Sequence, residues 1–570
     1  MVKNQLNNNL KGKKWIDLGS LIIALFAIIL LNYVGSFFFG RFDLTAEKRY
    51  TLSDATIDNL ENLQDIVFVR VYLEGNLPTE FRELKDATKE MLDELRAYSS
   101  GNLEYEFINP SASTDEEERV EVYKELTRQG LQYSNIRMRT GDKLSEQIIF
   151  PGAILTFNGK ETPIQILKGQ KGISQQEMIA NSIQQLEYEF MSSLKKLSND
   201  EAKRIAFIEG HGEMDKLMTA DAEKALSEFY SVERLNINEQ VHALDGLDAI
   251  IIARPDSAYS EKDKFVIDQF VMNGGKVLWC IDPVFARMDS LKQSQFTMGL
   301  ALDHNLTDQL FKYGVRLNND LIMDLEAVPI PIVTGMVGNQ PNYEMFAWFY
   351  MPLLIGNQNH PISMGLERVK GEFSSSLEAI ELDDIKSTAL LSSSEKSRIV
   401  NTPTRISFNV LREKPRYEMY SSGPHNVGLL LEGNFTSVFK NRLPKKILDD
   451  DGIDFKEQSA SNKMIVLSDG NIIANEVNRK EEIYYALGFY KYTEETYGNK
   501  EFILNAMNYL LDDSGLLNIR SKDFKIRILD QSKIDRNRIF WQSLNAAFPI
   551  AIVLLFGWLR MYFRKRIYGR

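Results

Sequence analysis

Two long apolar segments, one near each end of the chain, constrain its fold more than any other feature. Residues 18–40 (LGSLIIALFAIILLNYVGSFFFG) run for 23 residues without a charge, and residues 539–559 (IFWQSLNAAFPIAIVLLFGWL) run for 21. A helix needs about 20 apolar residues to cross a bilayer. We therefore expect two transmembrane helices. The alternative for the first is a cleaved signal peptide, but its apolar run exceeds the usual length of roughly 7–15 residues.

Basic residues flank both segments on the sides that face the chain ends. The sequence KGKK precedes the first segment, and RMYFRKR follows the second. Because positive flanks stay in the cytoplasm, we expect cytoplasmic ends at residues 1–17 and 560–570. The large region between the spans is then extracytoplasmic, and periplasmic if the membrane is the inner membrane of a bacterium with two membranes.

The net charge is distributed unevenly along the chain. It is −12 overall, with +4 in residues 1–41 and +5 in residues 560–570, so the region between carries −21. An acidic body argues against a nucleic-acid partner, which requires a basic face. The single cysteine, Cys280, excludes an internal disulfide framework. The other residues suggest no cofactor and no metal.

Residues 45–170 show the pattern of a first extracytoplasmic domain. A strand (66–75), a helix (79–100) and a second strand (102–110) form a βαβ unit, and a further helix is expected near 114–129. Two strands within 147–167 meet at Asn158-Gly159, a strong hairpin signal. This order resembles the thioredoxin fold, with Pro151 where that fold carries its cis-proline. The redox C-x-x-C is absent, which excludes disulfide exchange and favours a scaffold or interaction module.

Residues 200–330 alternate between apolar strands and helices, which predicts a parallel, doubly wound α/β sheet. Ligands bind at the carboxyl ends of such strands. Three loops converge there, at residues 209–213, 254–256 and 282–283. The first carries Glu209, His211 and Glu213, and the third carries Asp282. These side chains form a candidate ligand-binding cluster. The structural alternative makes Gly210 and Gly212 turn residues and the carboxylates solvated caps.

The strand that contains Cys280 can be compared with a strand that ends in a catalytic cysteine nucleophile. The domain resembles the class I glutamine amidotransferase-like fold, whose nucleophile elbow reads G-x-C-x-G. Aligned to that pattern, Cys280 lies one residue before the nucleophile position, and the flanking glycines are absent. A shift of one residue turns a strand side chain to the opposite face. We therefore expect Cys280 to be a packing residue and assign no catalytic residue.

Residues 331–535 are expected to complete the extracytoplasmic region. Strands at 388–393 and 463–470 are predicted to rejoin the central sheet, and 440–463 is predicted to be an exposed polar loop. Asp469, at a strand end, is a further candidate ligand-binding residue. The aromatic-rich stretch 337–354 is either core or a partner-binding or sugar-stacking surface.

Several phrases together identify a family. These motifs resemble the gliding-motility ABC-transporter auxiliary proteins of GldG type from Bacteroidetes-like bacteria. They are RFDLTAEKRYTLSDAT after the first span, the GHGE loop, GGKVLWCIDP, MFAWFYMPLL, SDGN, YGNKEFILNAMNYLLDD and IRSKDFKIRILD. The resemblance implies partnership with a separate permease and a cytoplasmic ATPase. It also implies kinship with a domain shared with intraflagellar-transport proteins and proposed to bind carbohydrate, so a saccharide is a possible ligand.

The sequence is consistent with a separate ATPase subunit, because it contains no G-x-x-x-x-G-K-[ST] loop to hold nucleotide phosphates. We therefore expect a non-catalytic auxiliary subunit of an ABC transporter required for gliding. The alternatives are a periplasmic hydrolase or amidotransferase-like enzyme, and a purely structural link to the envelope motility machinery.

Overall fold

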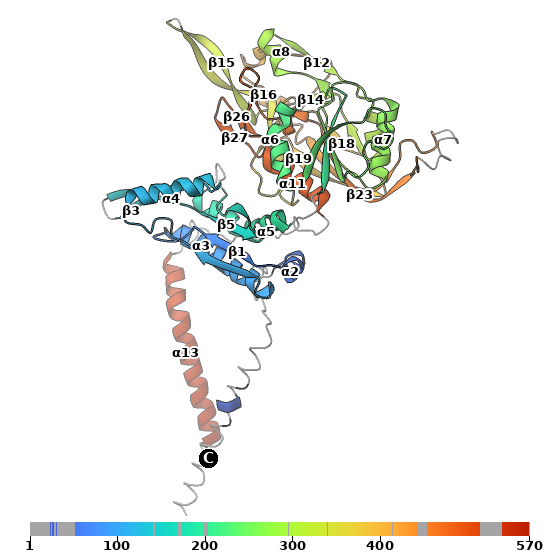
Figure 1. Ribbon diagram of the computed structural model, residues 1–570. Coiled ribbons are helices and arrows are strands. Elements are labelled where there is room, and N and C mark those ends of the chain that lie inside the picture. Colours follow the sequence, from blue (N-terminus) through green and yellow to red (C-terminus); the bar gives the residue numbers. More distant parts are fainter. Residues whose placement is uncertain are drawn as a thin grey trace, which may run out of the picture. The chain divides into compact units, whose positions relative to one another are not determined.

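The computed structural model divides into two units, Met1–Ser53 and Asp54–Arg570 (Figure 1). The first is described at only a few positions, so the apolar segment predicted to span the membrane at 18–40 lies almost wholly outside the described residues. The structure describes residues 23, 25–27, 30, 52–140, 143–168, 174–198, 203–294, 296–338, 340–412, 414–442, 453–512 and 538–568.

A four-stranded sheet lies in the first part of the second unit. Its strand order is β2-β1-β5-β6, in which β1 and β2 are parallel and β5 pairs antiparallel with both neighbours. Helix α5 packs on β5 and β6 and also contacts α3. The elements are α2 (Asp54–Glu61), β1 (Val67–Val71), α3 (Thr79–Tyr98), β2 (Leu103–Phe107), α4 (Glu116–Arg128), β3 (Ser134–Thr140), β4 (Lys143–Ile149), β5 (Gly152–Phe157), β6 (Lys160–Gln165) and α5 (Gln175–Ser198).

The hairpin predicted at Asn158-Gly159 is confirmed. Both residues have positive φ, 49° and 73°, as the favoured two-residue hairpin turn requires. The expectation of a cis-proline at Pro151 is wrong. Within the described parts of the chain, cis peptide bonds precede Pro403 and Pro424, and the bond before Pro151 is trans.

The second sheet has twelve strands and begins with a parallel half. Its order runs β8-β7-β9-β10-β23, with each neighbouring pair parallel. Near-continuous apolar strands bury both of their faces, and all five residues of β9 are buried. The elements are β7 (Arg204–Glu209), α6 (Lys216–Ser227), β8 (Ser231–Asn236), β9 (Ala249–Ala253), α7 (Glu261–Met272), β10 (Lys276–Cys280), β23 (Gln458–Leu467) and α11 (Asn499–Leu511).

Helices cover both faces of this parallel half. Alternate strand residues such as Ile252 and Trp279 belong to one buried cluster with Val266 and Phe270 of α7. The intervening residues therefore point to the other face, where α11 contacts β10, β23 and α6. The architecture is a mixed α/β domain with a helix layer on each side of the sheet, as Figure 1 shows.

An antiparallel half continues the same sheet beyond β23. Strands β22, β19, β16 and β15 follow in that order, so the predicted return of 388–393 and 463–470 to the central sheet is confirmed. Strands β15 and β16 form a long hairpin that extends clear of the sheet in Figure 1. The bounds are β15 (Ala327–Val337), β16 (Gln340–Gly356), β19 (Ile385–Ser392) and β22 (Asn426–Thr436).

Shorter elements connect or flank these strands. They are β11 (Val284–Phe285), α8 (Met288–Gln293), β12 (Thr297–Ala301), α9 (Thr307–Lys312), β13 (Val315–Leu317), β14 (Asp320–Asp324), β17 (Val369–Lys370), β18 (Leu377–Ala379), β20 (Ser397–Asn401), β21 (Thr404–Ile406), η1 (Phe408–Leu411), η2 (Tyr417–Met419), η3 (Gly470–Ile473), β24 (Val477–Asn478), β25 (Ile483–Tyr484), β26 (Phe489–Tyr490) and β27 (Glu495–Thr496).

The last described element is α13 (Arg538–Tyr568), a helix of 31 residues. Among the described residues it is the one helix long and apolar enough to cross a membrane, over Phe540–Arg566, and that window is not buried against the rest of the chain. It contains the apolar segment predicted at 539–559.

Candidate functional site

Two carboxylates meet at the carboxyl-end edge of the parallel strands. Cys280 of β10 lies opposite Leu467 of β23, so Asp282 and Asp469, each two residues further on, leave neighbouring strands at the same level. Asp282 is 2% exposed and Asp469 is fully buried. The structure thus brings together two of the five site residues predicted from the sequence.

Asp469 is held by three donors. Its Oδ2 accepts from the Ser374 hydroxyl at 2.5 Å and from the Glu372 N–H at 2.7 Å, and its Oδ1 accepts from the Asn471 N–H at 2.9 Å. Burial, together with the neighbouring Asp282 carboxylate, raises the pKa of Asp469 from 3.8 to about 7, although these donors act in the opposite direction.

Asp282 has its own donors. It accepts from the Gly470 N–H at 2.6 Å and from Nη1 of Arg287 at 3.0 Å. Both carboxyl groups are therefore hydrogen-bonded within the protein, as buried polar groups require. This arrangement stabilises the ends of the strands.

Arg254 borders this carboxylate pair. It directly follows β9 with a φ of 55°, and its N–H donates to the Cys280 carbonyl at 2.7 Å. Its guanidinium donates to the Asn471 side chain, and burial lowers its pKa. A Cβ on Gly470 would lie 2.5 Å from the Cβ of Arg254, so only glycine fits at position 470.

A second polar group forms around His211. The His211 Nε2 lies 3.1 Å from Oδ2 of Asp263, and its ring stacks on Tyr259 with 3.7 Å between centroids. Tyr259 donates its hydroxyl to Glu213 at 2.5 Å, and Glu213 also accepts from the His211 N–H at 2.7 Å.

The ionisable side chains of this group shift one another's pKa values. Burial alone would lower the pKa of His211, but the Glu213 and Asp263 carboxylates outweigh it and the pKa is raised. Burial would raise the pKa of Glu213, but hydrogen bonds from His211 and Tyr259 lower it overall. His211 is 8% exposed, so its ring is packed inside the loop that follows β7.

Glu209 belongs to neither group. Its side chain is 45% exposed and accepts from Nε of Arg234 at 2.5 Å. Arg234 also pairs with Glu223 of α6. The expectation of one cluster containing Glu209, His211, Glu213 and Asp282 is therefore wrong in its geometry, because the contacts separate these residues into three groups.

Cys280 lies beside the carboxylate pair but is inaccessible. It is fully buried, and burial, with Asp469 and Asp282 nearby, raises its pKa well above the usual value for a thiol. A nucleophilic cysteine requires the thiolate and access to a substrate. In the part of the chain that the structure describes, no group of three His, Cys, Asp or Glu side chains could hold a metal ion.

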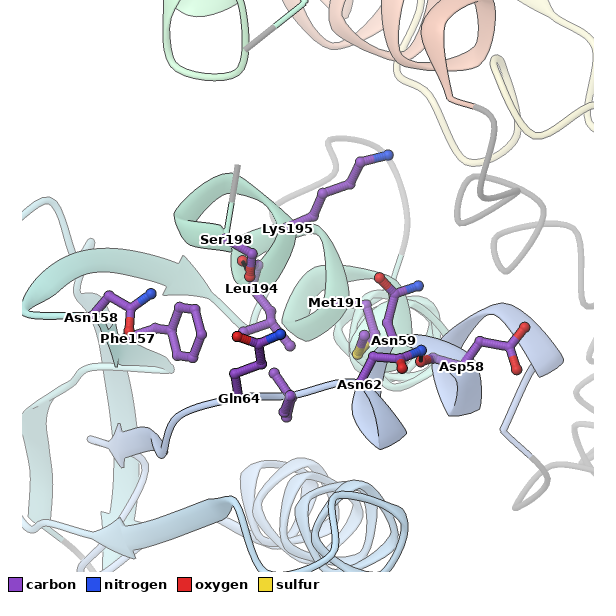
Figure 2. Close-up of a pocket in the computed structure, with 11 residues that line it drawn as sticks. Asp58, Asn59, Asn62, Gln64, Phe157, Asn158, Met191, Leu194, Lys195 and Ser198 are labelled. Atoms are coloured by element: carbon purple, nitrogen blue, oxygen red, sulfur yellow. Dashed lines mark hydrogen bonds between the residues drawn. The ribbon is translucent and has the colours of Figure 1, made fainter. Parts of the chain in front are cut away.

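A cavity of about 430 Å³ lies elsewhere, between α2, α5 and the turn that joins β5 to β6. Figure 2 shows apolar side chains such as Phe157 and Leu194 beside amide side chains such as Gln64. The sequence patterns did not predict this cavity. It is lined by Asp58, Asn59, Asn62, Leu63, Gln64, Phe157, Asn158, Met191, Leu194, Lys195 and Ser198.

The fold and the family match together indicate a mixed α/β protein with a C-terminal apolar helix that is associated with membrane transport. The chain belongs to the family of auxiliary ABC-transport proteins described as "ABC-type uncharacterized transport system", which matches residues 202–506. This family implies transporter partners at a membrane. Residues 46–156 match a domain of unknown function, DUF7088.

Other comparisons add little. No curated protein matches the chain significantly. The solved structure titled "mmIFT52 N-terminal domain" is similar over 55% of this chain and 99% of its own length, with 13% identity and a TM-score of 0.32. A similarity this low supports no conclusion about fold or function.

Proposed function

We propose that this chain is a membrane-anchored, non-catalytic auxiliary subunit of an ABC transporter. It acts with a separate permease and a cytoplasmic ATPase in a bacterial inner membrane. The observation that carries the proposal is the family match over residues 202–506. The GldG-type phrases in the sequence extend it to a transporter that serves gliding motility.

Helix α13 supports the membrane anchor. Its window Phe540–Arg566 has a mean hydropathy of 1.8 and ends in a cluster of basic residues. Such a cluster favours a cytoplasmic end. With a second span at 18–40, both termini are cytoplasmic and the two α/β regions are periplasmic.

The internal bonding of the strand-end groups supports a non-catalytic role. Asp282 and Asp469 accept hydrogen bonds from other residues of the chain, Nε2 of His211 lies 3.1 Å from Asp263, and each of the three residues is less than one-tenth exposed. Groups bound in this way stabilise loops. The strand order β2-β1-β5-β6 supports a thioredoxin-like scaffold, and the helix-covered parallel half supports an amidotransferase-like domain without its nucleophile.

A complementation experiment tests the non-catalytic role. Cells lacking this chain should lose gliding, and a variant combining Glu209→Gln, His211→Gln and Asp282→Asn should restore it. All three substitutions remove acid–base chemistry, and Glu209→Gln and Asp282→Asn also keep the side-chain shape. Asp245→Asn, at a side chain 72% exposed, is the matched control. Loss of gliding in the triple variant at wild-type protein level would favour the hydrolase or amidotransferase-like alternative.

A further inference from the structure

One face of helix α13 carries arginine and apolar side chains together, and we call it the arginine face. Its members follow one another at three or four residues along the helix, and side chains at this spacing lie on the same side of a helix. All of them are exposed, and they line one hollow on the helix surface: Phe556, Leu559, Arg560, Phe563 and Arg564. The described parts of the chain therefore leave this face open to another molecule.

The arginine face lies at the end of the apolar segment. Residues 539–559 contain no charged side chain, and Arg560 is the first charge after them. In a helix that crosses the membrane, about 20 apolar residues fill the hydrocarbon, so Arg560 and Arg564 reach the level of the lipid headgroups. Trp558 and Tyr562 belong to the same two turns, and such aromatic side chains are enriched at that level. This depth rests on the membrane anchor of the proposed function.

The two arginines have no counterion within the helix. The last acidic residue of the chain is Asp535, so residues 536–570 contain no carboxylate side chain. Arg560 and Arg564 are four residues apart, a spacing at which like charges on a helix repel each other. The apolar window of α13 that contains them is not buried against other described residues, so carboxylates elsewhere in the described chain do not cover it. A negative group from outside must therefore neutralise the pair.

We propose that the arginine face binds the headgroup phosphate of an anionic phospholipid. A guanidinium group presents a planar fork of donors that matches phosphate oxygens, and two such groups one turn apart converge on one phosphate. Phe556, Leu559 and Phe563, on the same face, contact the acyl chains of that lipid. An anionic headgroup is preferred to a zwitterionic one, because the latter brings an ammonium group toward the two guanidinium groups.

The order of side chains along the face favours a lipid over a protein. Phe556 and Leu559, which are 66% and 37% exposed, lie on the side of the membrane centre, and Arg564 lies towards the end of the helix. A phospholipid presents hydrocarbon and phosphate in the same order. A second copy of the helix would lie parallel in the membrane and would set arginine against arginine, which disfavours it. An acidic protein segment supplies the charge but not the adjoining hydrocarbon.

Native mass spectrometry of the purified, full-length chain in detergent tests this site. The delipidated protein is titrated with phosphatidylglycerol or with phosphatidylethanolamine of the same acyl chains. The wild type should bind its first phosphatidylglycerol several-fold more tightly than its first phosphatidylethanolamine. Arg560→Gln combined with Arg564→Gln should abolish this preference. Lys565→Gln combined with Arg566→Gln removes the same two charges outside the lining of the hollow and should retain the preference.

Three outcomes would overturn the proposal. They are equal affinity of the wild type for the two lipids, an equal loss of preference in both double variants, and efficient displacement of the lipid by glycerol 3-phosphate. The last would assign the face to soluble phosphates, because that probe has no acyl chains.

Alkaline extraction of native membranes separates this inference from the proposed function. A wild-type chain released by alkali would contradict the membrane anchor itself. A chain that stays in the membrane but shows no lipid preference would contradict only the lipid site. Both double variants should also resist extraction and melt at the wild-type temperature, so that a lost preference reports on the arginine face.

Discussion

The pKa of Asp469 makes its contribution to stability depend on pH. In the folded chain this pKa is about 7, against an ordinary value of 3.8. Between these values the folded chain keeps a proton that the unfolded chain has lost. Stability therefore falls as pH rises from about 4 to 7, because the unfolded state binds fewer protons.

Asp469→Asn removes this titration. The melting temperature of the variant minus that of the wild type should rise steadily between pH 4 and pH 7, since the variant has no carboxyl group at position 469 to ionise. Thermal melts of the two full-length proteins in the same detergent measure it. A difference that stays constant or falls over this range would show that Asp469 is not held protonated.

Cys280 is the second residue with a direct test. Because it is fully buried and its pKa is raised, Cys280→Ala should leave gliding unchanged and lower the free energy of unfolding by about 1 kcal/mol, the cost of a small cavity. Gliding assays and thermal melts measure the two effects. A severe loss of gliding in a stable Cys280→Ala protein would assign chemistry to the thiol.

At the scale of elements, the loop after β7 depends on close packing at Gly212. This residue has a φ of 73°, and an added Cβ would lie 1.7 Å from Oδ1 of Asp256. Gly159, in the turn between β5 and β6, also has a φ of 73°, but an added Cβ there meets nothing within 4 Å. Substitutions at these two glycines therefore separate the cost of backbone strain from the cost of a steric clash.

Gly159→Ala should cost only the strain of a left-handed alanine, about 1 kcal/mol. Gly212→Ala should cost clearly more, because the Asp256 side chain or the loop must move. Thermal melts of both variants provide the comparison. Equal losses for the two variants would mean that the loop after β7 is not packed against Asp256.

The elements that the sequence predicts best are those with strong local patterns. The strand predicted at 276–282 is β10 (Lys276–Cys280), and the turn at Asn158-Gly159 is correct, since apolar runs and turn residues act over a few positions. The loop predicted at 440–463 is partly wrong. Residues 443–452 lie outside the described parts, but β23 begins at Gln458, and its polar first half pairs with β22.

In the candidate site, too, local sequence patterns predict some residues and miss others. Asp282 and Asp469 could be predicted because each lies two residues beyond the end of a parallel strand. Arg254 lies in a loop that the sequence places at the same edge, but its half-buried position beside the two carboxyl groups has no sequence signature. Glu372 and Ser374 reach Asp469 from about 95 residues away, a contact fixed only by tertiary packing.

Residues 363–400 are rich in Ser, Glu and Lys, and several of these serines are buried. Ser376 donates to Asp320 at 2.6 Å, and Ser394 donates to Asp324 at 2.5 Å, in both cases between buried side chains. A hydroxyl paired with a carboxylate in this way satisfies both groups in the core. Such pairs join separate segments, so composition alone does not reveal them.

At the scale of the whole molecule, the proposed function requires that this chain works with other transporter subunits. The family match and the apolar helix α13 both indicate a subunit that works at a membrane with other transport proteins. The chain itself carries no nucleotide-binding G-x-x-x-x-G-K-[ST] loop. In the proposed function, the energy for transport comes from the separate ATPase subunit.

Purification of the tagged, full-length chain from crosslinked native membranes tests this claim most directly. A tagged, unrelated inner-membrane protein at the same level is the control. We predict that a permease with several membrane spans and an ATPase with a nucleotide-binding loop are recovered with this chain and not with the control. Recovery of this chain without either subunit would contradict the account.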